Sequence, residues 1–254
     1  MNYTMMHPVP PGNSYRPNGN ETAIDDYFDE AERLGLGVMY DMRHSESLVK
    51  TLTDQVGWAN ASLVQPQIEE FRNRKSLLVW YTADEPDGPV TPINSTRETR
   101  QLINSLDPYH PVTLVLNCGD HYWNEYSSGA DILLLDPYPV AVNPTFSKKW
   151  STEVTYDYGC SGCDGCAGSL YDTSNRVDDY ANRARIMGKQ REMPLWIVPQ
   201  MFDDHGDEFW WRIPNGAEAA VQVVLAWNHG VKGHCAWIYT SASNDILLVC
   251  HIHF

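Results

Sequence analysis

The chain lacks several features that mark common classes of protein. Its 254 residues contain no apolar run of 18 or more, so we expect no transmembrane helix. The first residues have neither the basic nor the apolar region of a signal peptide. No Gly-x-Gly-x-x-Gly or P-loop follows a predicted strand, which argues against nucleotide binding. No His-Glu-x-x-His occurs, so we expect no cofactor and no catalytic metal.

Basic residues are scarce. The chain has 18 Lys and Arg against 33 Asp and Glu, for a net charge of −15. A strongly acidic surface repels nucleic acids and anionic membranes, so we expect neither as a partner. The same charge disfavours a polyanionic substrate unless a local basic pocket overrides it.

Cysteine is neither absent nor dense, with six residues in the chain. Cys160, Cys163 and Cys166 form one cluster whose C-x2-C-x2-C spacing resembles a metal site but lacks a fourth ligand. One or two disulfides that fix a Gly-rich loop are the simpler interpretation. If two members of the cluster pair, the third is left for Cys118 or Cys235.

Four Asn-x-Ser/Thr sequons accompany these cysteines, at Asn2, Asn20, Asn60 and Asn94. Sequons also arise by chance in cytosolic proteins. Taken with the cysteines, they favour a secreted, disulfide-bonded glycoprotein whose leader lies outside this chain.

Near-continuous apolar runs predict buried parallel strands, because both faces of such a strand are covered. Six such runs occur, over residues 36–40, 76–81, 112–116, 130–135, 195–199 and 234–239, and residues 2–6 form a possible seventh. Helical patterns separate them, over residues 21–34, 62–74, 96–106, 176–188 and 216–229. The alternation predicts an α/β fold, a single (β/α)8 barrel domain over residues 1–254.

The predicted barrel is incomplete. Only seven strands can be counted, and a first strand and a last helix are not evident. The final residues, 246–254, are either a short strand or an irregular tail.

Polar residues follow almost every predicted strand. In a (β/α) barrel the carboxyl ends of the strands converge on one face, where the chemistry takes place. We therefore take the substrate-binding candidates from these positions and the loops beyond them: Asp41, Arg43, Asn117, Tyr138, Gln200, Asp203, His205, Trp211 and Trp237. For the tryptophans, core packing is the alternative interpretation.

The strongest catalytic candidate is Glu85, which ends an apolar strand beside Asp84 and before Pro86. Glycoside hydrolysis needs a carboxylic acid that protonates the leaving oxygen and usually a second carboxylate. A neighbouring carboxylate and partial burial help such an acid to keep its proton near neutral pH. Two adjacent carboxylates at a strand end are costly to bury, so function explains them better than stability does.

The stretch Val79-Trp80-Tyr81-Thr82-Ala83-Asp84-Glu85-Pro86 resembles the end of strand four in clan A glycoside hydrolases, whose signature is Asn-Glu-Pro or a variant. The resemblance implies that Glu85 is the general acid/base and that Asp84 takes the place of the sugar-binding Asn. It further implies a carbohydrate substrate, an oligo- or polysaccharide.

The chain departs from that pattern at strand seven, where Gln200 stands in place of the nucleophilic Glu. Another carboxylate is one substitute, with Asp136 the first candidate and Asp203 and Asp204 next. A second alternative is a nucleophile supplied by the substrate. Asp84-Glu85 resembles the Asp-Glu pair of family 20 hexosaminidases, in which the Asp orients the acetamido group of the substrate.

The third alternative is a protein that binds sugar without cleaving it. A metal-dependent hydrolase built from the histidines and aspartates is a weaker hypothesis, and insensitivity to chelators would remove it.

Overall fold

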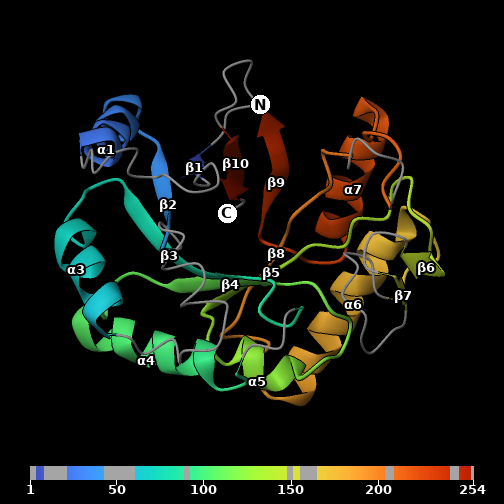
Figure 1. The fold of residues 1–254 in the computed structure, drawn as a ribbon, viewed down its shortest axis with the longest axis horizontal. Coiled ribbons are helices and arrows are strands. Elements are labelled where there is room, and N and C mark those ends of the chain that lie inside the picture. Colours follow the sequence, from blue (N-terminus) through green and yellow to red (C-terminus); the bar gives the residue numbers. More distant parts are fainter. Residues whose placement is uncertain are drawn as a thin grey trace.

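The computed structural model describes residues 4–8, 22–42, 61–88, 92–147, 151–154, 165–203, 209–240 and 246–252, and all statements below concern these residues. Eight strands in them close into a barrel in the order β1-β10-β9-β8-β5-β4-β3-β2 (Figure 1). The strands are β1 (Met5–Pro8), β2 (Gly37–Asp41), β3 (Leu77–Asp84), β4 (Val112–Leu116), β5 (Ile132–Leu135), β8 (Leu195–Ile197), β9 (Gly233–Thr240) and β10 (Ile246–Ile252).

Seven of these strands run parallel to one another, and the eighth, β10, runs antiparallel to its neighbours β1 and β9. All seven predicted strands are present, although β1 occupies Met5–Pro8 instead of residues 2–6. The final apolar run is a strand and not an irregular tail. The fold is thus an α/β barrel of seven parallel strands that an antiparallel strand closes, rather than a regular (β/α)8 barrel.

Helices cover the outside of the barrel in an arc, and β10 lies between the two ends of this arc (Figure 1). They are α1 (Thr22–Leu34), α3 (Ala61–Phe71), α4 (Ser95–Leu106), α5 (Trp123–Ser127), α6 (Tyr171–Ile186) and α7 (Gly216–Asn228). The five predicted helices are confirmed, α6 begins earlier than expected, and the short α5 was not predicted. None of the described helices is long and apolar enough to cross a membrane.

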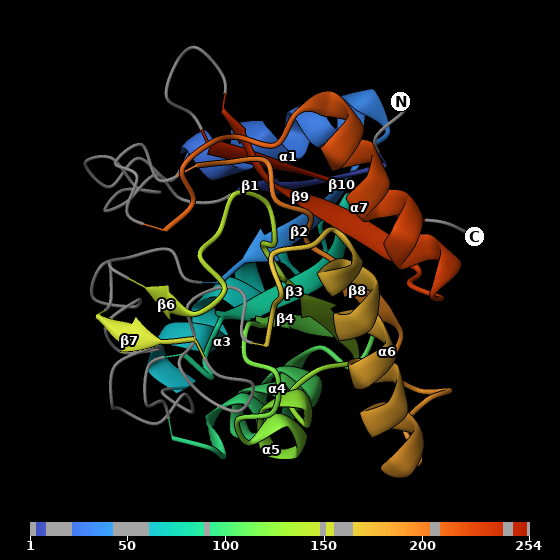
Figure 2. The same ribbon diagram turned by 90° about the vertical axis from the view of Figure 1, so that its right-hand side faces the viewer.

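A two-stranded sheet of β6 (Phe146–Ser147) and β7 (Thr152–Glu153) lies beyond the carboxyl ends of the parallel strands (Figure 2). It belongs to the long connection between β5 and α6, for which no strand was predicted.

The barrel has an inner core and two outer cores. The inner core fills the barrel with alternate residues of the parallel strands, including Met5, Met39, Val79, Val115 and Leu134. One outer core packs β2 and β3 against α1, α3 and α4, and the other packs β4 and β5 against α5, α6 and α7. This alternation decides which side chains at the strand ends point into the barrel.

The start of α7 offers a test of local stability. Oδ1 of Asn215 accepts hydrogen bonds from the backbone N–H groups of Ala217 (2.9 Å) and Glu218 (3.0 Å), and Glu218 accepts one in return from the N–H of Asn215 (2.8 Å). We expect Asn215→Ala to lower the free energy of unfolding by about 1 kcal/mol in urea titrations. Asn215→Ser keeps the acceptor and should lose much less; an equal loss in both variants would refute the capping role.

Candidate active site

A layer of polar residues lies above the inner core, at the carboxyl ends of the parallel strands. The alternation that starts from Met5, Met39, Val115, Leu134 and Trp196 continues into this layer. Its members are His7, Asp41, Tyr81, Asp84, Asn117, Asp136, Gln200 and Trp237. Six of the eight were predicted as site residues. His7 and Tyr81 were missed, although the Met5–His7 alternation in β1 is a usable signal.

A bulge in β3 brings two of these side chains together. Tyr81 pairs with Thr113 and Ala83 pairs with Leu114, so the register slips by one residue between them. Because of this slip, Tyr81 and Asp84 both point inward although they are three residues apart. The Tyr81 hydroxyl donates a hydrogen bond of 2.6 Å to Oδ1 of Asp84 and fixes that carboxylate.

Glu85 has a strained backbone. Its φ is +48°, in the left-handed region that favours glycine. Its N–H donates to the carbonyl of Val115 (3.2 Å) and its carbonyl accepts from the N–H of Gly88 (2.9 Å), so the tight turn is anchored at both ends. Such strain persists where the surroundings impose it, and it is frequent at active sites.

The carboxyl group of Glu85 lies close enough to that of Asp136, which follows β5, for the two groups to interact directly. Asp136 is 2% exposed, whereas Glu85 is only partly buried. Burial is the main cause that raises the pKa of Asp136 well above its usual range, and the charge and hydrogen bond of Glu85 raise it further. Two carboxyl groups this close do not both ionise readily, so the pair holds a proton more tightly than an isolated carboxyl group does.

Asp87 is a third carboxyl group in this region, and the sequence analysis did not single it out. It is 1% exposed and accepts hydrogen bonds from the backbone N–H groups of Asn117 (3.2 Å) and Cys118 (2.8 Å). Burial raises its pKa to about 7, the two N–H groups oppose this shift, and the charge of Glu85 adds to it. Asp87 therefore ties the Glu85 turn to the end of β4.

Several buried polar atoms in the layer have no hydrogen-bond partner. They are both ring nitrogens of His7, Oδ1 of Asn117 and Oδ1 of Asp136, and each of these residues is at most 2% exposed. Buried polar groups are nearly always paired, since an unpaired one costs about 1–3 kcal/mol. These three residues lie in one inward-facing layer, where the polar groups of a ligand could form the missing hydrogen bonds.

Gln200 has a different environment from the one predicted. It is fully buried, and its amide oxygen accepts from the N–H of Val140 (2.9 Å). Its amide nitrogen donates to the carbonyls of Val140 (3.1 Å) and Phe202 (3.2 Å). The side chain thus joins the loops after β5 and β8, which is a structural task and not the predicted contact with a sugar.

This geometry predicts the result of restoring the glutamate of the clan A pattern. In Gln200→Glu a carboxylate oxygen would face the carbonyls of Val140 and Phe202 without a proton to donate. We expect the free energy of unfolding to fall by at least about 2 kcal/mol and no gain in turnover. Gln190→Glu makes the same chemical change at an exposed position and should stay within about 0.5 kcal/mol of wild type. Equal stability of both variants would show that the amide of Gln200 is dispensable.

Aromatic residues border the layer. Tyr138 is buried, its ring contacts those of Phe202 (4.9 Å between centroids) and Trp210 (5.9 Å), and the indole N–H of Trp210 donates to its carbonyl. Trp210 therefore belongs to the core, while Trp211 is 51% exposed and available to a ligand. Trp237 is partly buried on β9, across the barrel from β3 in the strand order.

The remaining predicted residues fall into two groups. Asp203 is described and partly buried, whereas Arg43, His205 and Asp204 lie outside the described residues. In the described part of the chain, no group of three or more His, Cys, Asp or Glu has a geometry that could hold a metal ion. Cys160 and Cys163 lie outside the described residues, so the disulfide pairing stays a prediction.

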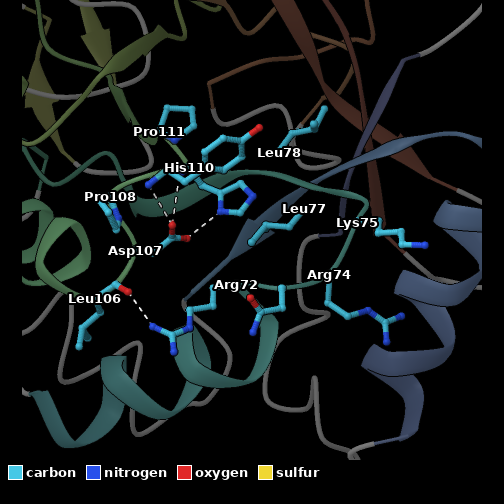
Figure 3. A pocket seen from close by; sticks show the side chains of 12 residues that line it. Arg72, Arg74, Lys75, Leu77, Leu78, Leu106, Asp107, Pro108, His110 and Pro111 are labelled. Atoms are coloured by element: carbon cyan, nitrogen blue, oxygen red, sulfur yellow. Dashed lines mark hydrogen bonds and ion pairs between the residues drawn. The ribbon is translucent and has the colours of Figure 1, made fainter.

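A cavity of about 910 Å³ lies at the opposite end of the barrel, where β3 and β4 begin. Its basic side chains point in different directions (Figure 3). Arg72 donates to the carbonyl of Leu106 (2.8 Å), while Arg74 turns toward α1 and pairs with acidic residues there, Asp25, Asp29 and Glu32. Because these groups do not converge, and because this end of a barrel serves stability, we place the candidate site at the carboxyl ends of the strands.

No protein-family model and no curated protein sequence matches the chain. Solved structures match it in fold. A β-galactosidase from Halorubrum lacusprofundi has a TM-score of 0.61 at 12% identity over 89% of this chain and 46% of its own. A candidate α-L-fucosidase from Bacteroides thetaiotaomicron has a TM-score of 0.58 at 12% identity over 85% of this chain and 64% of its own. The chain thus spans less than two thirds of each neighbour, and it shares the barrel fold of glycoside hydrolases.

Proposed function

We propose that the protein is a glycoside hydrolase that cleaves O-glycosidic bonds of a carbohydrate, with Glu85 as the residue that protonates the leaving oxygen. The observation that carries this proposal is the meeting of two carboxyl groups, Glu85 and the buried Asp136, at the carboxyl ends of β3 and β5. The glycosidase-like fold supports it. The strained turn at Glu85 supports it independently.

The two carboxyl groups have unequal access to a ligand. Glu85 is partly exposed and can meet a glycosidic oxygen, whereas Asp136 is buried behind it. In the proposed step the proton that the pair shares passes from Glu85 to the glycosidic oxygen while the bond from the anomeric carbon to that oxygen breaks, and the bonding electron pair stays on the oxygen. Water, or first the acetamido oxygen of the substrate and then water, forms the new bond to the anomeric carbon, and the proton that this water releases returns to the pair. Asp136 is therefore a positioning residue that keeps a proton available.

Asp136 does not fit the role of the second catalytic carboxylate. In glycosidases the two carboxyl groups flank the sugar, about 5–5.5 Å apart in retaining and about 6.5–9.5 Å apart in inverting enzymes. We infer from the direct interaction of Glu85 with Asp136 that these two groups are closer than either distance. The substrate-assisted alternative gains support, since Asp84 points inward and is fixed by Tyr81, as a residue that orients an acetamido group needs to be.

A second candidate function is the binding of carbohydrate without cleavage. The observation that favours it is Gln200, whose side chain is fully buried and bonded to the main chain where clan A enzymes carry their nucleophile.

We also propose that the protein is a secreted glycoprotein. Asn94, the sequon within the described residues, is exposed just before α4.

The test is a screen of wild type and Glu85→Gln against aryl glycosides that include N-acetylhexosaminides. Turnover by wild type that is lost in the variant supports a glycosidase, and a preference for acetamido sugars supports the substrate-assisted route. If calorimetry shows sugar binding without turnover, the protein binds carbohydrate without cleaving it and the hydrolase proposal is wrong. If wild type shows no turnover of these glycosides and no binding of sugar, both candidate functions are refuted.

A further inference from the structure

We propose that His7, oriented by Asp41, is a substrate-binding residue that accepts a hydrogen bond from a hydroxyl group of an uncharged sugar. This inference rests on the proposed carbohydrate function and deepens it. His7 is 1% exposed at the end of β1, and both of its ring nitrogens lack a hydrogen-bond partner. Nε2 faces Asp41, so Nδ1 is the nitrogen that a ligand could complete, and a buried unpaired nitrogen is costly.

Asp41 decides which nitrogen is available. Nε2 of His7 lies 3.4 Å from Oδ2 of Asp41, which is fully buried at the end of β2. A carboxylate at this position favours the tautomer with the proton on Nε2, as in many buried Asp–His pairs. Nδ1 then keeps its lone pair and is an acceptor, so its natural partner is a hydroxyl or amide donor of the ligand.

The ring of Tyr81 holds the imidazole from the side. The two ring centroids are 4.4 Å apart and the rings are tilted by 54°. The hydroxyl of the same Tyr81 donates to Asp84, next to Glu85 in the chain. His7 is therefore connected through one side chain to the turn that carries the proposed acid.

The strand order places His7 opposite that acid pair. In the closed barrel, β1 is separated from β5 by three strands on either side, so His7 and Asp136 belong to opposite walls. Both point inward, and Tyr81 and Asp84 on β3 lie on the wall between them. A sugar ring in this layer would have its leaving oxygen near Glu85 and a distant hydroxyl near His7.

The charges of the described residues in the layer favour a neutral sugar over an acidic one. Asp41, Asp84 and Asp136 belong to this inward-facing layer, and none of its eight described residues is Lys or Arg. The carboxylate of a uronic acid would meet like charges and, at Nδ1 of His7, another acceptor. The hydroxyl and amide groups of a neutral sugar are donors, so they can form hydrogen bonds with these carboxylates and with Nδ1 of His7.

Three variants of His7 test the assignment at the level of a single atom. Asn carries a polar atom near the position of Nδ1, Gln carries one near Nε2, and Phe keeps the ring without nitrogen. We expect His7→Phe and His7→Gln to raise KM for a neutral aryl glycoside by roughly 10-fold or more with kcat within about 3-fold. His7→Asn should recover most of the loss, and thermal unfolding shows whether each variant is folded.

Monodeoxy analogues of the best substrate identify the hydroxyl. One analogue should lose roughly 10-fold in kcat/KM with wild type and show no loss with His7→Phe. Wild type should prefer a neutral aryl glycoside over the matched uronide by about 100-fold or more. Identical discrimination among the deoxy analogues in wild type and His7→Phe would overturn the assignment.

A binding measurement does not depend on turnover. In the Glu85→Gln variant, the Nδ1 resonance of His7 in a nitrogen-detected NMR spectrum should shift when methyl glycosides of glucose, galactose, mannose or N-acetylglucosamine are added and bind. Binding of one of them without a shift refutes the role of His7 and leaves the proposed function intact. If none of them binds and no aryl glycoside is cleaved, the proposed function fails, and this inference fails with it.

Discussion

Glu85→Gly should give a protein that is inactive and more stable than wild type. A left-handed φ costs a non-glycine residue about 1–2 kcal/mol, and glycine adopts it without strain at an entropic cost of about 0.5–1 kcal/mol. Removal of the carboxylate also relieves its repulsion with Asp87 and Asp136. We expect a gain of about 1 kcal/mol in urea unfolding and a loss of activity of about 100- to 10,000-fold.

Ser151→Gly is the matched control. Ser151 is exposed between β6 and β7 and has a φ of +53°, so glycine should relieve strain there without any effect on turnover. A Glu85→Gly variant that is less stable than wild type would show that the glutamate is kept for the fold. In that case the strained turn would not support a catalytic role.

The second large effect is expected in Asp136→Asn. The amide of the new Asn donates a hydrogen bond to Glu85 and favours its ionised form, whereas Asp136 supplies a proton to the pair. We therefore expect the alkaline limb of the pH profile of kcat/KM to move to lower pH and the maximum to fall by about 10- to 100-fold. An unchanged profile would mean that Asp136 takes no part in the protonation of Glu85.

The same substitution should change how stability depends on pH. Asp87 and Asp136 both have folded-state pKa values above their unfolded values, to about 7 for Asp87. A raised pKa stabilises the fold fully below the unfolded pKa, near 4, and this contribution is lost as the pH rises through the folded pKa. Urea unfolding should show lower stability at about pH 8 than at about pH 5, with a smaller decline in Asp136→Asn.

Glu218 provides an internal contrast. The salt bridge with Arg212 is the main cause that lowers its pKa to about 2, so its contribution is present above about pH 4 and is lost only in stronger acid. Glu218→Gln should consequently leave the difference between about pH 5 and pH 8 unchanged. If stability falls equally between these two pH values in wild type, Asp136→Asn and Glu218→Gln, groups other than Asp136 cause the pH dependence.

The parallel strands could be predicted from sequence because each is a short apolar run bounded by polar residues. The convergence of their carboxyl ends then brought Glu85 and Asp136 together, although they lie 51 positions apart in the chain. Their proximity is the part of the candidate site that follows from the strand order, whereas their catalytic roles stay a prediction. The antiparallel direction of β10 was not predictable, because an apolar run carries no sign of direction.

The missed features depend on local backbone geometry. The bulge in β3 shifts the alternation by one residue and points Asp84 inward, which a strict period of two does not predict. The sequence Asp87-Gly88 is typical of an exposed loop. Asp87 is nevertheless buried, and it accepts hydrogen bonds from two backbone N–H groups at the end of β4. Gln200 was placed correctly at a strand end, yet its partners lie 60 positions away at Val140.

The most direct test of the central claim is the dependence of Glu85→Gln on the leaving group. An acid catalyst matters where the leaving oxygen must be protonated and matters little where the leaving group departs as a stable anion. With the sugar that wild type prefers, we predict a loss of about 100-fold or more for the methyl or methylumbelliferyl glycoside and below about 10-fold for the dinitrophenyl glycoside. An equal loss on all of these substrates would contradict the assignment of Glu85 as the acid.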